Sequence, residues 1–162
     1  MPKKEKIMEE TDIFQLIMDG NTSEAEKFIS DCDNIDICDE DGNTPLICAA
    51  YYGKTEIAAM LLAKKPSLDV RNDDGFSALH IAAISGSTEI AGMLLNAGAD
   101  KEITDERGRT PLLTAAANLN ADIIRMLIAE GADKTVRDSD GKTAAILLRE
   151  AVEGLIRESG IQ

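Results

Sequence analysis

Apolar residues recur along the chain in short stripes with the spacing of a helix. Each stripe places apolar residues at i, i+3 and i+4, and three copies are clear: Ile57, Met60 and Leu61; Ile90, Met93 and Leu94; Ile123, Met126 and Leu127. Such a stripe predicts a helix with one face packed on a neighbour. A second apolar run precedes each stripe and contains a pair of alanines, at 49–50, 82–83 and 115–116. The pattern therefore predicts pairs of short helices.

Polar turns separate these helix pairs at a fixed interval. Each turn contains a glycine, and four of these glycines are 33 residues apart: Gly42, Gly75, Gly108 and Gly141. Acidic turns such as 39–42 supply side chains that bond their own backbone, and the glycine supplies a positive φ. Thr44 then offers an N-cap, Pro45 fits the first helical position, and Gly53 is expected to end the first helix. A register this regular indicates an internal repeat.

These motifs resemble the ankyrin repeat family. The resemblance is carried by Gly42-Asn43-Thr44-Pro45-Leu46, Ser77-Ala78-Leu79-His80-Ile81-Ala82, Gly108-Arg109-Thr110-Pro111-Leu112, and the corners Gly98-Ala99-Asp100 and Gly131-Ala132-Asp133. It implies an all-α ankyrin-repeat solenoid of stacked helix-turn-helix units with protruding turns. We expect a flexible N-terminal tail (1–9) and one domain (10–162). The domain would comprise a cap (10–38), three full repeats (39–71, 72–104, 105–137) and a C-terminal cap (138–162).

The chain departs from the repeat pattern at three places. The N-terminal segment keeps Gly20 in the register of Gly53 but lacks the Thr-Pro-Leu motif, which is typical of a capping unit. Leu119 stands where a corner glycine is expected, so an altered helix-to-helix corner is predicted there. Val152 replaces the glycine of the last unit, charged residues make that unit polar, and a second helix would have no room to reach full length.

Composition and charge limit the function. The chain has 162 residues, 44% of them hydrophobic, with a formal net charge of −13. This balance fits one soluble domain and disfavours nucleic acid and anionic membranes as partners. No apolar run approaches the roughly 18 residues of a spanning helix, and no secretory signal is recognisable. We expect a cytoplasmic protein, with a nuclear or secreted-effector location left open.

Candidate chemistry is sparse, and neither a cofactor nor a metal is expected. His80, the single histidine, stands at a motif position that such repeats use to bond adjacent turns. The acidic turns lack the ligand spacing of a calcium loop, and no phosphate-binding glycine loop is present. Cys48 fits a small core residue. A regulatory bridge between Cys32 and Cys38 stays open, as does the alternative of a calcium-binding, metal-binding or enzymatic protein using the acidic turns.

The five aromatic residues divide between core and surface. Phe14 and Phe28 are expected to fill the N-terminal end of the core, whereas Tyr51, Tyr52 and Phe76 occupy positions that the apolar pattern does not require. The resemblance implies that turns and first helices line a concave face that grips partners. The candidate partner-binding residues are Glu40, Asp41, Asn43, Tyr51, Tyr52, Asp73, Asp74, Phe76, Ile84, Ser85, Glu106, Arg107, Arg109 and Asn118.

The function expected is a protein–protein interaction module or adaptor without catalysis. Tyr51, Tyr52, Phe76 and Ile84 would form one apolar patch with an acidic rim, and the later turns are mixed in sign. The partner should therefore present a basic and apolar surface. The chain is expected to be a monomer. An inhibitor or host-directed effector that masks its target with the same face is an alternative, as is self-association through the patch.

Overall fold

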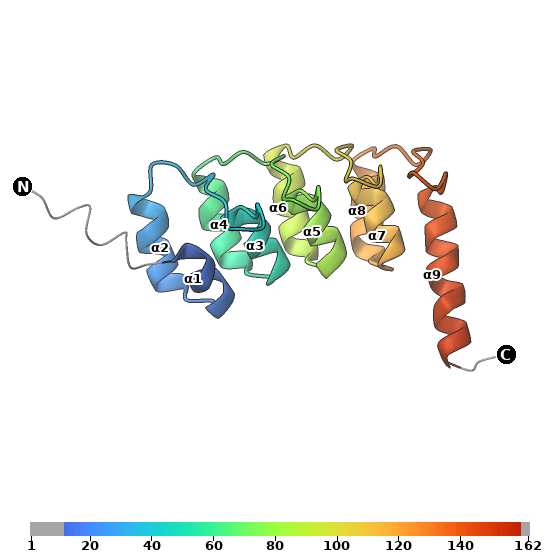
Figure 1. Cartoon of the computed structure of the whole chain (residues 1–162), viewed down its shortest axis with the longest axis horizontal. Coiled ribbons are helices and arrows are strands. Elements are labelled where there is room, and N and C mark those ends of the chain that lie inside the picture. Colours follow the sequence, from blue (N-terminus) through green and yellow to red (C-terminus); the bar gives the residue numbers. More distant parts are fainter. Residues whose placement is uncertain (1–11, 160–162) are drawn as a thin grey trace, which may run out of the picture.

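The computed structural model describes residues 12–159, which form nine α-helices and no strand. The all-α solenoid predicted from the repeats is confirmed (Figure 1). The tail predicted at 1–9 lies outside the described residues. The helices are α1 (Ile13–Asp19), α2 (Thr22–Asp31), α3 (Pro45–Tyr51), α4 (Thr55–Ala63), α5 (Ala78–Ser85), α6 (Thr88–Ala97), α7 (Pro111–Ala117), α8 (Ala121–Ala129) and α9 (Ala144–Ser159).

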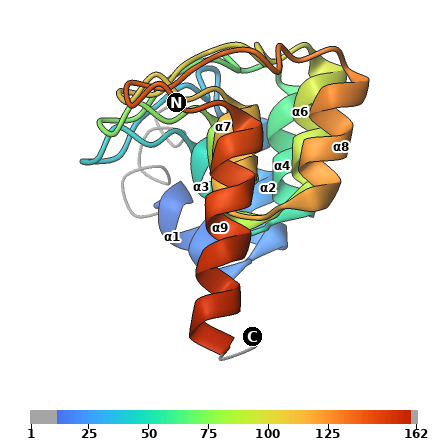
Figure 2. The same ribbon diagram turned by 90° about the vertical axis from the view of Figure 1, so that its right-hand side faces the viewer.

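The helices stand in two rows. An inner row contains α1, α3, α5, α7 and α9, each in contact with the next, and an outer row contains α2, α4, α6 and α8 (Figures 1 and 2). Each outer helix packs against the inner helix that precedes it in the chain. Among residues 12–159, no helix is long and apolar enough to cross a membrane.

The inner helices begin at the caps that the motifs predicted. The Thr44 hydroxyl accepts a hydrogen bond from the Ile47 backbone N–H at 3.2 Å, and Thr110 caps α7 in the same way. Pro45 and Pro111 occupy the first helical positions, where a missing N–H costs nothing. Local sequence therefore fixes where α3 and α7 start.

Small residues let the two rows approach closely. The alanine pairs at 49–50, 82–83 and 115–116 are at most 1% exposed, and Ile57, Leu61 and their counterparts in the next two repeats are fully buried. Phe14 and Phe28 are half-buried against the same core at its N-terminal end, as predicted. A continuous aliphatic core therefore runs through the stack without large rings.

The turns also contact one another along the stack. Asp39 Oδ1 accepts hydrogen bonds from the N–H groups of Asp41 and Asn43, which confirms that the acidic turns bond their own backbone. Neighbouring turns are then joined by the Asp73 N–H, which donates to the Asp41 carbonyl at 3.1 Å. A Cβ on Gly75 would lie 2.9 Å from the Glu106 backbone nitrogen, so only glycine allows this approach. The turns thus form a connected platform beside the inner helices.

The altered corner predicted at Leu119 is wrong. Leu119 adopts φ 60°, the left-handed conformation that Gly53 and Gly86 adopt at the equivalent corners. The Asn120 N–H donates to the Ala115 carbonyl at 3.0 Å, just as the Lys54 N–H donates to Ala49 at 2.8 Å. Packing of the two flanking helices therefore maintains the corner despite the local cost of positive φ in leucine.

The C-terminal unit also differs from the prediction of a short second helix. Residues 144–159 form one helix, α9, which extends beyond the end of α7 (Figures 1 and 2). Val152 occupies the position at which Gly53 and Gly86 end their helices, so no left-handed corner forms and the first helix continues. The last described unit is therefore a single helix in the inner row.

Candidate functional site

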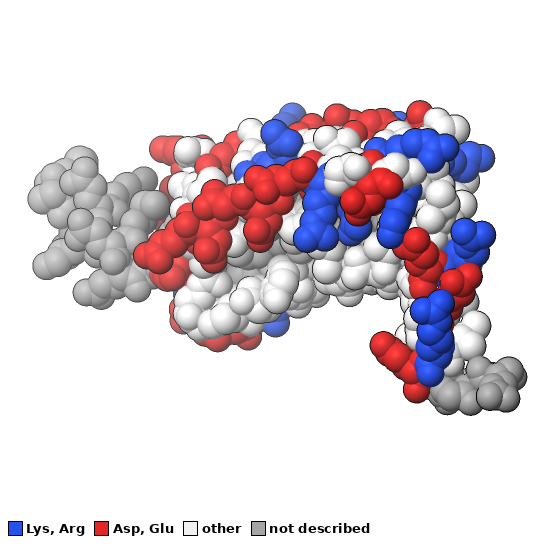
Figure 3. All heavy atoms as spheres, turned by 45° about the vertical axis from the view of Figure 1, so that its right-hand side comes forward, with Lys and Arg blue, Asp and Glu red and all other residues white. Residues whose placement is uncertain are grey.

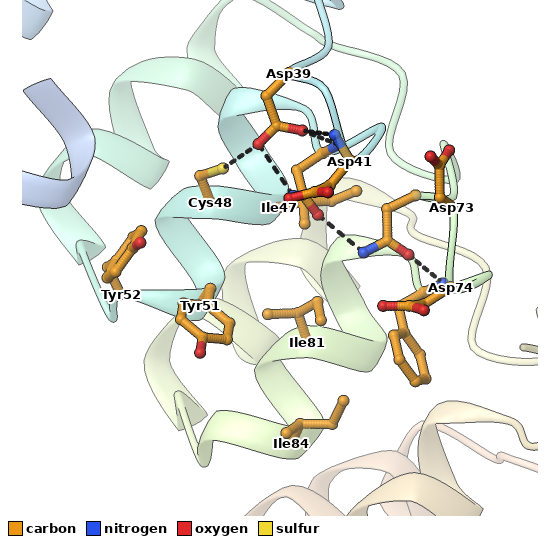
Figure 4. Close-up of a pocket in the computed structure, with 13 residues that line it drawn as sticks. Asp39, Asp41, Ile47, Cys48, Tyr51, Tyr52, Asp73, Asp74, Ile81 and Ile84 are labelled. Atoms are coloured by element: carbon orange, nitrogen blue, oxygen red, sulfur yellow. Dashed lines mark hydrogen bonds between the residues drawn. The ribbon is translucent and has the colours of Figure 1, made fainter. Parts of the chain in front are cut away.

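A groove of about 560 Å³ lies between the turns and the inner helices of the first two full repeats. Tyr51 and Tyr52 border it at the end of α3, and Ile84 borders it from the second repeat (Figure 4). Phe76 of the second repeat also lines it. Tyr51 is 61% exposed and Tyr52 42%, and their rings meet edge to face with centroids 5.0 Å apart. The apolar patch predicted from sequence therefore lines one concavity.

A second hollow of about 440 Å³ continues from the first. The two share Asp74, Phe76 and Ile84, and the second is lined further by Asp105, Glu106, Arg107, Arg109, Thr114 and Asn118. The pair forms a trough that runs along the stack, and we refer to it as the concave groove. Its walls come from the turns and its floor from α3, α5 and α7.

The structure brings together all of the predicted partner-binding residues except Glu40 and Ser85. Glu40 is exposed on its turn but does not line either hollow. Ser85 is exposed at the end of α5, and its hydroxyl donates to the Ala50 carbonyl at 3.1 Å. Ser85 therefore links one repeat to the preceding one, which is a structural role that the sequence pattern did not suggest.

Several groove residues were missed by the sequence analysis. Cys48, Ile81 and Thr114 occupy the same repeat position, on the side of the inner helix that faces the groove. The signal available was that this position varies in residue type while the neighbouring alanine pair does not. Thr114 is 4% exposed, and within the described chain its buried hydroxyl has no hydrogen-bond partner. The groove floor thus includes a buried hydroxyl that no described residue satisfies.

The charge along the turns goes from acidic to mixed. The charged residues that line the first hollow are all acidic, namely Asp39, Asp41, Asp73 and Asp74, whereas the second is lined by Arg107 and Arg109 together with Asp74, Asp105 and Glu106. On the face shown in Figure 3, acidic side chains gather toward the N-terminal turns, and basic side chains alternate with acidic ones toward the C-terminal turns. This polarity agrees with the prediction of an acidic rim followed by turns of mixed sign.

One ion pair anchors Arg109 at the C-terminal end of the groove. Arg109 Nε lies 3.3 Å from Asp138 Oδ2, and Asp138 is 6% exposed. Burial opposes ionisation of this carboxyl, but the N–H groups of Lys142 and Asp140 and the Arg109 guanidinium outweigh it and hold the pKa of Asp138 below its usual value. Asp138 therefore stays charged and fixes the Arg109 side chain against the next turn.

His80 has a structural position, as its place in the motif predicted. The side chain is fully buried, and Nε2 lies 2.9 Å from the Arg109 carbonyl in the following repeat. Nδ1 accepts from the Ser77 N–H at 3.3 Å, so the neutral Nε2–H tautomer fits both contacts. Burial, opposed by the bond to the Arg109 carbonyl, lowers the pKa of His80. The imidazole therefore joins two repeats and does not face the groove.

The cysteines and acidic residues form no evident reactive centre within residues 12–159. Cys32 is buried and its thiol donates to the Asn34 carbonyl, Cys38 is exposed, and no disulfide joins them. Cys48 is buried beside Asp39, and both burial and that carboxylate raise the pKa of its thiol to about 12. No cluster of three or more potential metal ligands occurs in the described chain.

Comparison with known proteins agrees with this geometry. A family model described as ankyrin repeats in three copies matches residues 13–105 and 94–161. No curated protein matches the chain at a significant level.

Proposed function

Because the chain belongs to the ankyrin repeat family, whose repeats are generally protein–protein interaction modules, we propose that it is a non-catalytic adaptor that binds a partner protein in its concave groove. The observation that carries the proposal is the pair of exposed tyrosines at the edge of the first hollow. Tyrosine is enriched at binding hot spots because it offers a large rigid surface with a polar tip. The apolar pattern of the repeats does not require aromatic residues at these positions.

The charges around the tyrosines indicate the chemistry of the partner. Asp41, Asp73 and Asp74 surround the first hollow, and Ile84 contributes to its apolar floor. An apolar side chain flanked by lysine or arginine would satisfy both features, and acidic turns would speed the encounter with it. The partner segment is therefore expected to be basic where it meets the first two repeats.

The connected turns favour a groove that is formed before binding. Asn72 donates to Asn43 at 2.9 Å, and the Ser139 N–H donates to the Arg107 carbonyl at 2.8 Å, so successive turns hold one another. A surface ordered in advance loses little conformational entropy when a partner binds. Such a module fits the role of an adaptor that presents a fixed surface.

The proposal is tested by comparing partner capture by the unmodified chain and by a Tyr51→Ala/Tyr52→Ala variant, followed by measurement of the affinity for the captured partner. Both tyrosines are exposed, so the double variant should keep its helical circular dichroism. Loss of two hot-spot side chains should weaken binding by about 2 kcal/mol or more, roughly 30-fold.

Met18→Ala provides the control, because Met18 is 43% exposed but does not line the concave groove. The control should bind as the unmodified chain does. Equal affinity of the tyrosine variant and the unmodified chain would refute binding through the first hollow.

A further inference from the structure

The last helix exposes an unusual amount of apolar surface. Eight large apolar side chains are exposed in the described chain, and four of them lie on α9: Leu148, Val152, Leu155 and Ile156. Leu148 is 36% exposed, Val152 42% and Leu155 53%. A helix advances about 100° per residue, so these three side chains fall on one narrow arc of α9. The charged residues Arg149 and Glu153 lie on an adjacent arc.

The internal repeat shows which way this apolar arc faces, because α5 is the equivalent helix of an earlier repeat. Ser85 of α5 points to the preceding repeat, where it bonds Ala50, and His80 points to the following repeat, where it bonds Arg109. Ile81 and Ile84 line the groove. The remaining side of α5 is the one on which α6 packs.

On α9, this remaining side is the arc of Leu148, Val152 and Leu155. Leu148 stands in the register of Ala49, Ala82 and Ala115, all of which are fully buried. In each of those repeats an outer helix, α4, α6 or α8, covers the inner helix. Among the described residues no helix stands beside α9 in the outer row (Figure 2).

The neighbouring outer helix supplies a second, independent sign of the same site. Ile128 of α8 is 41% exposed, although Leu62 and Leu95 at the equivalent positions are packed against the core. Both helices that border the vacant outer position therefore present aliphatic side chains to it. By contrast, the side of α9 that would face a following repeat carries Arg149 and Glu153, which are joined by an ion pair at 3.9 Å. The end of the stack is thus polar toward another repeat but apolar toward a single helix.

We propose that the surface formed by Leu148, Val152 and Leu155 of α9 with Ile128 of α8 docks one amphipathic helix of a partner polypeptide. We refer to this surface as the terminal helix site. The chemistry of the occupant follows from the outer helices themselves, which meet the inner row through isoleucine and leucine four residues apart, as in Ile57 and Leu61. The partner helix should carry the same aliphatic pair and lie along the outer side of α9, reaching past the level at which α7 ends so as to cover Val152 and Leu155.

A second copy of the chain is a poorer occupant. Its described outer helices already bury their aliphatic pairs, since Ile57, Ile90 and Ile123 are fully buried, and so they have no such face to offer. Its α9 exposes the same aliphatic arc, but Arg149 and Glu153 flank that arc and would be brought beside it.

The test is a titration of the isotope-labelled full chain with a peptide that copies residues 119–132, which contain Ile123 and Leu127 of α8, followed by NMR. The control peptide carries Ile123→Asp and Leu127→Asp. We expect saturable shifts at α9 and Ile128 with the first peptide and none with the second, at concentrations up to about 1 mM. Val152→Asp in the chain should weaken the response at least about tenfold, because a carboxylate would be buried against aliphatic residues.

The proposal is overturned if no saturable shift occurs, if both peptides act alike, or if the shifts map to the groove around Tyr51 and Phe76. Sedimentation of the chain alone provides the remaining control, and a monomer is expected. A dimer that Val152→Asp dissociates would assign the terminal helix site to a second copy and would also contradict the proposal. None of these outcomes depends on the concave groove, so the two proposals fail separately.

Discussion

Replacing His80 by alanine tests how the repeats are joined. The fully buried imidazole accepts from the Ser77 N–H and donates to the Arg109 carbonyl. The Arg109 carbonyl keeps a second partner in the Asp105 N–H at 3.0 Å, but the buried Ser77 N–H loses an acceptor. The unpaired donor and the cavity together should cost about 3 kcal/mol, or roughly 10 °C in Tm for a chain of this size.

The pH dependence of this stability loss distinguishes removal of a buried neutral histidine from removal of packing alone. Folding lowers the pKa of His80 below 6.5, chiefly by burial. As pH falls through 6.5, the unfolded chain binds a proton that the native chain does not, so the native state loses stability until the folded pKa is reached. His80→Ala lacks this loss. Its penalty should therefore be smaller at about pH 5.5 than at about pH 7.5.

Urea unfolding followed by circular dichroism at the two pH values measures the stability loss caused by His80→Ala and its change with pH. Ile47→Ala is the matched control, because Ile47 occupies the same repeat position, is 2% exposed and does not titrate. Its penalty should be the same at both pH values. An equal or larger penalty for His80→Ala at the lower pH would refute the assignment of a neutral, hydrogen-bonded imidazole.

Three further predictions concern other sites. Asp138→Asn should lower the free energy of unfolding by about 2 kcal/mol at neutral pH, because the pairing with Arg109 is lost. Its unfolding should also be less sensitive to acid, since the stability that comes from the lowered carboxyl pKa is present above about pH 3.8 and disappears as the pH falls through the pKa of the folded state. Acid titrations of both proteins check this. Leu119→Val should lower the free energy of unfolding by about 1–2 kcal/mol in urea titrations, because a β-branched residue tolerates φ 60° poorly. Near neutral pH, a thiol reagent should modify the exposed Cys38 quickly, whereas it should modify Cys48, whose pKa is raised to about 12, only when the chain unfolds. Cys38→Ser should remove the fast phase of the reaction.

Local signals with a single physical meaning gave most of the fold. Thr44 and Pro45 fix the start of α3, and Gly42 and Gly75 fix the turns. Because these signals recur every 33 residues, the sequence also indicates how many units are stacked. The groove followed from the same register, because equivalent positions of successive repeats lie side by side. The position of Tyr51 at the groove was therefore predictable from the sequence.

The errors arose where tertiary packing outweighs local preference. Leu119 keeps a left-handed corner because the helices on either side are held by their neighbours, which no pattern in a single repeat reveals. Val152 lets α9 continue, since no glycine stops it. Asp105 and Asp138 are buried within turns that were expected to be exposed, and Ser85 bonds across repeats. These features depend on contacts between units, which the repeat pattern by itself does not report.

Binding of a partner through the turns and inner helices of the first two full repeats should be visible in amide hydrogen exchange. Exchange is measured for the chain alone and for the chain saturated with its captured partner. We expect slower exchange over residues 39–52 and 72–85, with little change in α4 and α6. Slower exchange confined to the outer helices, with the turns unaffected, would contradict it.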